Sequence, residues 1–256
     1  MSWNPDQYLK FADHRLRPAL DLLTRISAET PETIVDLGCG PGNITEWLMR
    51  RWPEARITGI DSSLDMLERA RQTHPGAAWE QADIGQWLPK VPADVIYSNA
   101  ALQWLDNHRP LFAKLYAALA PGGVLAVQMP RNFDQPSHVL MRQAAQDGPW
   151  RDVLAPYLRP SPVAAPVDYW RMLQPLGAGI DIWECDYLQI LSGDDPVLQW
   201  MLGTTLRPLL AALSEMERDA YLDVYRHLLR EAYPREADGV TLFPFRRLFI
   251  LATKSL

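Results

Sequence analysis

Apolar positions in the first half of the chain follow two alternating patterns. Short apolar runs, each typical of a buried strand, lie at residues 33–37, 56–60, 77–80, 94–98 and 124–128. Between these runs the apolar residues recur at helical spacing, which predicts helices over residues 44–49, 64–73 and 110–120. Strands and helices that alternate in this order predict an α/β fold, with a parallel sheet covered by helices on both faces.

The remaining segments follow a different pattern. Residues 149–175 contain six prolines, which predicts loops and short helices. Further strands are predicted at residues 180–190 and 245–253, and further helices at residues 196–213 and 214–231. The last of these helices opens with Ser214 and Glu217, which form a capping box. At the N-terminus, apolar spacing broken at Pro18 predicts two short helices or one kinked helix.

Composition narrows the class of protein. The chain has 256 residues, of which 48% are hydrophobic and 22% charged, and this suits one globular domain. It carries 25 basic against 31 acidic residues, and its four lysines form no cluster. A protein that binds a nucleic acid backbone needs clustered basic side chains. Nucleic acid is therefore excluded as a partner.

Cysteine usage and the length of the apolar runs indicate the cellular compartment of the protein. Cys39 and Cys185 are too few for a disulfide framework, and the spacing of cysteine and histidine matches no metal site. No apolar run reaches the roughly 20 residues that cross a bilayer. The first residues also lack the basic start and apolar core of a signal peptide. We expect a cytoplasmic protein with no bound metal and no membrane contact.

A glycine-rich turn carries the strongest functional signal. Residues 38–42 read Gly-Cys-Gly-Pro-Gly and connect a predicted strand to a predicted helix. Glycines let the backbone turn tightly and approach a ligand, and the start of a helix presents unpaired N–H groups. Asp61 ends the following strand about twenty residues on, where its carboxylate can accept both ribose hydroxyls. This two-part spacing favours a nucleoside-containing ligand over an ordinary strand-to-helix corner.

The spacing Gly-x-Gly-x-Gly differs from the dinucleotide pattern Gly-x-Gly-x-x-Gly. Together with Asp83 and Ile84 after the third strand, and with residues 94–104 and 119–125, it resembles the class I S-adenosylmethionine-dependent methyltransferases. The resemblance implies a Rossmann-like, doubly wound sheet of seven mostly parallel strands with an antiparallel last strand and a helical cap. It also implies S-adenosyl-L-methionine as cofactor and S-adenosyl-L-homocysteine as product.

The resemblance assigns a cofactor-binding set. Asp83 and Ile84 match the place where that family holds the adenine, and Arg15 is preferred to Arg17 for the methionyl carboxylate. The full predicted set is Tyr8, Arg15, Asp36, Gly38, Gly40, Asp61, Ser62, Met66, Asp83, Ile84 and Asn99.

The likeness extends to the branch of this family that methylates a small polycarboxylate, trans-aconitate. The matching segments are residues 3–9, 15–18, 57–63, 98–104, 124–130, 138–142 and 247–253, whereas residues 143–175 match least. This resemblance implies transfer of a methyl group to a carboxylate, giving a monomethyl ester. A carboxylate with a pKa near 4 is already ionised at neutral pH, so no general base is needed. No catalytic residue is predicted, and orientation of the carboxylate is the expected contribution.

A substrate with several carboxylates needs positive charge in a protein of net charge −6. Arginine offers paired planar donors that match a carboxylate. The predicted substrate-binding set is Trp104, Arg131, His138, Arg207 and Arg247. For each arginine, a solvated surface position remains the alternative.

The predicted organisation is one domain over residues 1–256. Residues 1–30 form an N-terminal helical cap, residues 31–130 the cofactor-binding half, and residues 131–256 the substrate-cap insertions and the last two strands. Three alternatives stay open: a nicotinamide-dependent oxidoreductase, a non-catalytic protein that binds S-adenosylmethionine, and a methyltransferase for another small carboxylic acid or an acyl thioester. The sequence assigns no oligomeric partner.

Overall fold

The computed structural model describes residues 12–158 and 160–256, with side chains from Leu16 onward. Its centre is a seven-stranded sheet in the order β3-β2-β1-β4-β5-β7-β6. The strands are β1 (Thr33–Leu37), β2 (Arg56–Asp61), β3 (Ala78–Gln81), β4 (Ala93–Asn99), β5 (Leu119–Pro130), β6 (Gly179–Leu191) and β7 (Thr241–Thr253). The pairs among β1 to β5 are parallel, and β7 runs antiparallel to both β5 and β6. The predicted doubly wound sheet with an antiparallel last strand is confirmed.

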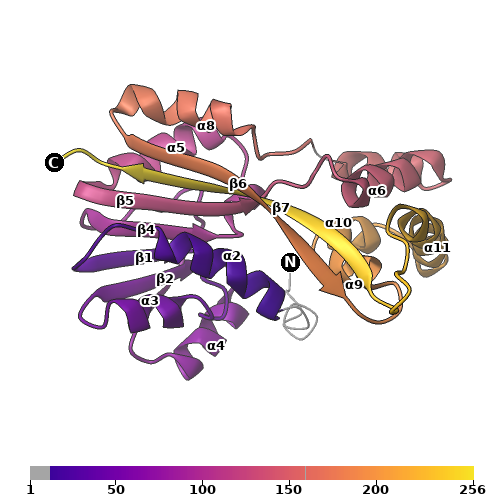
Figure 1. Ribbon diagram of the computed structural model, residues 1–256, viewed down its shortest axis with the longest axis horizontal. Helices are drawn as coiled ribbons and strands as arrows, with labels where there is room; N and C mark the ends of the chain where they lie inside the picture. The colour runs from indigo at the N-terminus through magenta and orange to yellow at the C-terminus, as the bar shows by residue number, and fades with distance from the viewer. Residues whose placement is uncertain (1–11, 159) are drawn as a thin grey trace.

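Helices cover both faces of this sheet (Figure 1). The helices of the sheet region are α2 (Ala12–Thr24), α3 (Thr45–Arg51), α4 (Leu64–Thr73), α5 (His108–Ala117) and α8 (Pro166–Leu173). One apolar core joins Leu22 of α2 and Leu48 of α3 to one face. A second core joins Phe112 of α5 and Tyr169 of α8 to the other face. Alternation of side chains along each buried strand supplies apolar groups to both cores.

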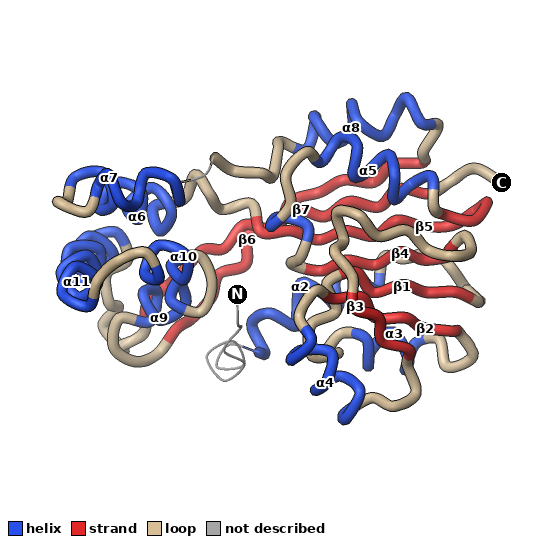
Figure 2. Tube along the Cα trace, turned by 180° about the vertical axis from the view of Figure 1, so that it is seen from behind, coloured by secondary structure: helices blue, strands red, loops and turns tan. Residues whose placement is uncertain are grey.

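A helical cap lies around one end of the antiparallel β6–β7 pair, where β6 ends and β7 begins. Its helices are α6 (Pro136–Asp147), α7 (Arg151–Leu154), α9 (Pro196–Leu202), α10 (Leu206–Ala211) and α11 (Glu215–Ala232). Figure 2 shows β6 and β7 leaving the sheet to reach this group of helices. Phe243 and Phe245 of β7 belong to the apolar core of the cap. The antiparallel pairing of β6 and β7 therefore continues from the sheet into the cap.

Short 3₁₀ helices complete the described elements: η1 (Leu102–Trp104), η2 (Ala155–Tyr157) and η3 (Gln174–Leu176). The proline-rich segment thus forms short helices, as predicted, and Pro166 opens α8 at a position where its missing N–H costs nothing. Within the described residues, no helix has the length and apolar character needed to cross a membrane.

Several elements differ from the sequence prediction, and β7 begins four residues earlier than predicted, at Thr241, because it pairs with β6 along its whole length. Strand β5 begins at Leu119, so α5 ends at Ala117 and the Pro-Gly-Gly segment lies inside the strand, where the pairing with β4 shifts register. The helix predicted over residues 196–213 is divided at Gly203 into α9 and α10. Helix α6 was not predicted. The N-terminal prediction begins outside the described residues, and the described part is one helix, α2, with Pro18 inside it.

Candidate active site

Gly38, Gly40 and Gly42 of the glycine-rich turn all adopt positive φ angles that favour glycine, and the space around the first two differs. Gly38 has φ +75°, and a Cβ there would lie 2.2 Å from the Cβ of Ala101. Gly40 has φ +55°, and a Cβ there would meet no atom within 4 Å. Gly38 therefore allows β1 to approach the loop after β4, whereas Gly40 leaves open space beside the turn.

Asp61 lies at the end of β2 and fixes the turn. Its Oδ2 accepts a hydrogen bond from the Gly40 N–H at 2.9 Å, and its Oδ1 accepts one from the Ser63 N–H at 2.9 Å. Ser63 rather than Ser62 caps α4, because its hydroxyl accepts from the Met66 N–H. Each carboxylate oxygen has a further lone pair, so Asp61 can accept two more hydrogen bonds from a ligand.

Asp36 of β1 is an acidic group buried under the same turn. Its side chain is 2% exposed, and its Oδ2 accepts a hydrogen bond from the Thr45 hydroxyl at 2.7 Å. Burial, and to a smaller degree the charge of Asp61, raises the pKa of Asp36 to about 7, although the bond from Thr45 opposes the shift. A cation placed beside Asp36 would stabilise its carboxylate.

Four more predicted cofactor residues lie after the end of β3 and around the start of α4. Asp83 is exposed, and its Oδ1 accepts from the Gly85 N–H at 2.8 Å. Ile84 is half-buried beside the turn, since a Cβ on Gly38 would lie 3.4 Å from its Cδ1. Met66 is buried, and Ser62 is exposed. The structure thus brings Ile84 next to Gly38, and Asp83 precedes it in the turn after β3.

The loop after β4 is held in a strained conformation. Ala100 has φ +53°, which is unfavourable for a residue with a side chain. Its N–H donates to the Gln128 carbonyl at 2.9 Å, and its carbonyl accepts from Nε2 of Gln103 at 2.6 Å. Two oxygens in this loop, Oδ1 of Asn99 and Oε1 of Gln103, are buried and have no hydrogen-bond partner among the described residues.

His108, at the start of α5, makes a hydrogen bond that holds this loop in place. Its Nε2 lies 3.0 Å from the Leu102 carbonyl, and its Nδ1 lies 2.5 Å from the Tyr169 hydroxyl. A carbonyl can only accept, so the proton is on Nε2, and Nδ1 accepts from Tyr169. Burial lowers the pKa of His108, which keeps the ring neutral. No sequence motif marks His108, because its contacts with Leu102 and Tyr169 appear only in the fold.

A second polar group lies on the strands beside the loop. Arg247 of β7 is 3% exposed, and its Nη1 donates to Oε1 of Gln128 at 3.2 Å. Its guanidinium also lies 4.7 Å above the ring of Phe245. Asn99 lies opposite Gln128 in the β4–β5 pair, and Pro130 lies opposite Arg247 in the β5–β7 pair. The structure therefore places Asn99, Gln128 and Arg247 on three neighbouring strands.

These three side chains point to one face of the sheet. On each strand, the residue two positions away belongs to the core beneath α2. Side chains two residues apart on a strand share a face. Asn99, Gln128 and Arg247 therefore point to the α2 face, between the core of the sheet and the core of the cap. Gln128 was missed from the sequence, and the available signal was one polar residue inside an otherwise apolar strand.

The other predicted substrate residues are dispersed. Arg131 donates to Oε1 of Glu184 at 2.8 Å and to the Ala164 carbonyl at 3.2 Å, which places its guanidinium beside β6 and the segment before α8. Arg207 is half-buried at the start of α10, and Trp104 is 43% exposed on η1. The described contacts give Arg131 a structural role, and its part in substrate binding stays a prediction.

His138 lies inside the cap. It is 4% exposed, and its ring centroid lies 5.0 Å from that of Phe133. Burial, with a smaller contribution from the Arg142 charge, lowers the pKa of His138 to about 4. The ring is therefore neutral at pH 7 and offers a carboxylate no charge-assisted bond. Tyr8 lies outside the described residues, and Arg15 is described only as part of the backbone of α2.

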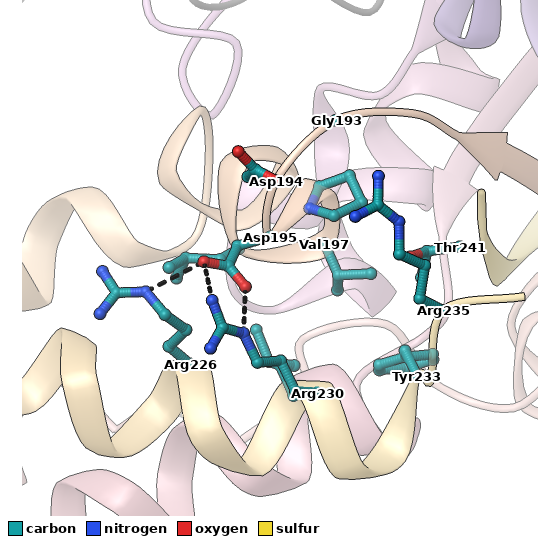
Figure 3. Close-up of a pocket in the computed structure, with 12 residues that line it drawn as sticks. Gly193, Asp194, Asp195, Val197, Arg226, Arg230, Tyr233, Arg235 and Thr241 are labelled. Atoms are coloured by element: carbon teal, nitrogen blue, oxygen red, sulfur yellow. Dashed lines mark hydrogen bonds and ion pairs between the residues drawn. The ribbon is translucent and has the colours of Figure 1, made fainter. Parts of the chain in front are cut away.

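The cap also contains a cavity of about 330 Å³ between the segment before α9 and the C-terminal half of α11. Figure 3 shows Asp195 between two arginines there. Its carboxylate accepts from Nε of Arg230 at 2.6 Å and lies 3.2 Å from Nε of Arg226. These ion pairs join the segment before α9 to α11. The residues lining this cavity come from the cap and not from the glycine-rich turn.

Comparison with known proteins places the chain in a family. The family model described as "Methyltransferase domain" matches residues 34–123. Trans-aconitate 2-methyltransferase of an Azoarcus species is 47% identical and aligns over 99% of both chains. Trans-aconitate 2-methyltransferase of Streptomyces avermitilis is 48% identical over 99% of this chain and 97% of its own length.

Solved structures agree on the fold. A putative methyltransferase of Bacillus halodurans superposes with a TM-score of 0.61 at 14% identity, covering 94% of this chain and all of its own. Phosphoethanolamine N-methyltransferase 2 of Haemonchus contortus, solved with S-adenosyl-L-methionine, superposes with a TM-score of 0.55 at 16% identity, covering 94% of this chain and 53% of its own. The full-length matches confirm the methyltransferase prediction: the chain belongs to the trans-aconitate 2-methyltransferases, a family of S-adenosylmethionine-dependent methyltransferases.

Proposed function

We propose that this protein transfers the methyl group of S-adenosyl-L-methionine to a carboxylate of trans-aconitate and so forms a monomethyl ester. The family supplies the acceptor as a hypothesis. The observation that carries it is the Arg247–Gln128 pair, a buried guanidinium and amide at the edge of the glycine-rich site. Such donors suit an acceptor with several carboxylates.

The residues around the turn fit the cofactor. S-adenosyl-L-methionine carries two ribose hydroxyls and an ammonium, all of which donate hydrogen bonds. Asp61 can accept from the ribose, while the Asn99 and Gln103 oxygens, which have no partner among the described residues, can accept from the ammonium. The open space beside Gly40 lets a ligand reach the backbone. We therefore assign these residues to the cofactor.

The bound cofactor supplies an electrophilic methyl group on a sulfonium. The acceptor carboxylate is ionised at neutral pH, so the protein has no proton to remove. What its residues contribute is orientation: Gln128 and Arg247 hold the acceptor on the α2 face, and Asp61 fixes the cofactor side. Fixing two reactants in a productive geometry is worth several kcal/mol, and in favourable cases about 7–11 kcal/mol.

We also propose the division of the chain made from the sequence. Residues 1–30 form the N-terminal helical cap, residues 31–130 the cofactor-binding half, and residues 131–256 the substrate-cap insertions and the last two strands. A cytoplasmic location is supported by two free cysteines, Cys39 and Cys185.

The test is methyl transfer from labelled S-adenosyl-L-methionine to a panel of acids. We expect trans-aconitate to be methylated with the highest kcat/KM, a dicarboxylate lacking one of its carboxylates more slowly, and an acyl thioester not at all. Mass spectrometry of the product should show one added methyl group and an ester that alkali hydrolyses. A protein that binds the cofactor tightly but methylates no acid in the panel would refute the proposal.

A further inference from the structure

Buried amides with unpaired atoms gather where the sheet meets the cap. Among the described residues, the unpaired amide atoms are Oδ1 of Asn99, Oε1 of Gln103, Nε2 of Gln128 and Nδ2 of Asn132. A buried polar atom without a hydrogen bond destabilises a fold, so such atoms are few in proteins and call for an explanation. The two oxygens lie in the loop beside the glycine-rich turn. The two nitrogens lie at and after the end of β5.

The orientation of the Gln128 amide follows from its partner. Its Oε1 faces Nη1 of Arg247 at 3.2 Å. A guanidinium has only donors, so the atom facing it must be the oxygen. The nitrogen is therefore the atom turned away, and it has no partner among the described residues. Gln128 is fully buried, and its unpaired N–H groups are fixed in place by the arginine.

A chain of contacts connects this amide to the glycine-rich turn. Gly38 packs against Ala101, and the N–H of Ala100 donates to the Gln128 carbonyl. Gln128 in turn accepts from Arg247 on β7. The amide nitrogen thus lies one strand beyond the loop that borders the cofactor residues, on the side of the cap.

We infer that Gln128 determines acceptor specificity by donating its amide N–H to a carboxylate of the acceptor that is not methylated. The inference rests on the function proposed above and deepens it. An N–H donor held beside a guanidinium selects an anionic group at that position and disfavours an acceptor that lacks it. When Gln128 and Arg247 hold this other carboxylate, the reacting carboxylate is free to face the methyl group.

Two substitutions distinguish recognition from a purely structural role. Gln128→Glu keeps the shape and keeps an oxygen for Arg247, but it replaces the N–H donor with a negative charge. Gln128→Met keeps the volume and removes both the hydrogen bond to Arg247 and the free N–H donor. If Gln128 only holds Arg247 in place, glutamate should serve better than methionine, because a carboxylate binds a guanidinium more strongly than an amide does. If it recognises a carboxylate, glutamate should be worse, because like charges face each other.

We expect KM for trans-aconitate to rise about tenfold in Gln128→Met and about a hundredfold in Gln128→Glu. The Kd for S-adenosyl-L-methionine should stay within about twofold of the wild type in both. With a dicarboxylate that lacks the recognised group, Gln128→Met should change KM by less than about twofold. Gln189→Met is the matched control. It removes a buried amide from β6, a strand of the same sheet, and should leave KM for both acids unchanged.

A KM in Gln128→Glu equal to or lower than that in Gln128→Met would overturn the inference. If Gln128→Glu does not fold, Gln128→Met decides alone, since an unchanged KM for trans-aconitate would also overturn it. Failure of the proposed function has a different signature, in which the wild type itself binds S-adenosyl-L-methionine without methylating trans-aconitate. In that case, Gln128 is tested by calorimetric titration of trans-aconitate into the wild type and into Gln128→Met, each saturated with S-adenosyl-L-homocysteine. Binding to Gln128→Met that is about tenfold weaker than binding to the wild type supports the inference. Equal binding to the two proteins overturns it.

Discussion

The two sides of the candidate site are built differently. On the side of the glycine-rich turn, Asp61 accepts hydrogen bonds from the Ser63 N–H, two residues away, and from the Gly40 N–H, 21 residues away. On the side of the cap, Gln128 and Arg247 are 119 residues apart, and an amide nitrogen stays without a partner among the described residues. On the first side, Asp61 and the turn are held in place before a ligand binds, and only the Asn99 and Gln103 oxygens of the adjoining loop have no partner among the described residues. The second side offers hydrogen bonds that a ligand would complete.

The strongest test of this contrast separates fold from binding within the glycine-rich turn. In Gly40→Ala the new Cβ enters open space, so we expect the fold to persist while affinity for S-adenosyl-L-methionine falls on the order of a hundredfold, about 2.7 kcal/mol. In Gly38→Ala the new Cβ overlaps Ala101, so we expect a loss of stability of about 2–4 kcal/mol. Calorimetric Kd values and thermal melts distinguish the two. Equal effects of both substitutions on Kd and Tm would contradict the contrast.

Removal of Asp61 tests the side that is organised in advance. Asp61→Ala leaves the ribose hydroxyls of a bound cofactor poorly paired, and it also removes the acceptor for two backbone N–H groups. Loss of bonds to a charged acceptor is worth roughly 1.5–3 kcal/mol, which corresponds to a ten- to hundredfold rise in Kd for the cofactor. KM for trans-aconitate at saturating cofactor should change by less than about threefold. Unchanged cofactor binding would remove Asp61 from the site.

The cap side is tested by an arginine with a matched neighbour. Arg247→Lys keeps the charge but removes the planar pair of donors, so we expect KM for trans-aconitate to rise about tenfold, or about 1.4 kcal/mol. Arg246→Lys alters the adjacent, partly exposed arginine of the same strand, which donates to Asp186, and it should leave KM unchanged. Affinity for S-adenosyl-L-methionine should be the same in both variants. If it falls in Arg247→Lys, this arginine belongs to the cofactor side instead.

The same contrast explains what the sequence could predict. The capping box of Ser214 and Glu217 and the strand β1 were correct to the residue, because each depends on local spacing. The start of β5 was missed, since pairing with β4 extends the strand through Gly122 and Gly123, two residues that read as a turn. Helix α6 was missed because its buried face includes two polar residues, Ser137 and His138, so its apolar positions do not follow a clear helical spacing.

The candidate site divides in the same way. The turn and Asp61 are recognisable as a motif, because Asp61 ends the strand that follows the turn, about twenty residues on. Gln128 is not visible in this way, since its importance depends on a partner from another strand. Arg131 and Arg247 look alike in sequence, yet the structure joins one to Glu184 on β6 and the other to Gln128 on β5. Pairing between distant strands decides which arginine faces the α2 side.

The smallest expected effect is a pH dependence on the cofactor side alone. The pKa of Asp36 is raised to about 7 because the group is buried, so much of it is protonated near pH 6. A cationic cofactor binds the carboxylate form better, so bound cofactor lowers this pKa and affinity rises with pH. Between pH 6 and pH 8 we expect Kd for S-adenosyl-L-methionine to fall by at most about tenfold, levelling off above pH 7.

Asp36→Asn keeps an acceptor for Thr45 and cannot titrate, so it should remove this pH dependence of Kd. The ligand-free protein supplies an independent readout with a defined sign. A raised folded-state pKa favours the fold fully below the ordinary value of 3.8, and the benefit is lost as pH rises through about 7. Thermal stability of the wild type should therefore fall relative to Asp36→Asn between pH 4 and pH 7. Because the acceptor is already ionised, kcat at saturation should stay level from pH 6 to pH 8, and a tenfold rise in kcat would mean that the reaction needs a base after all.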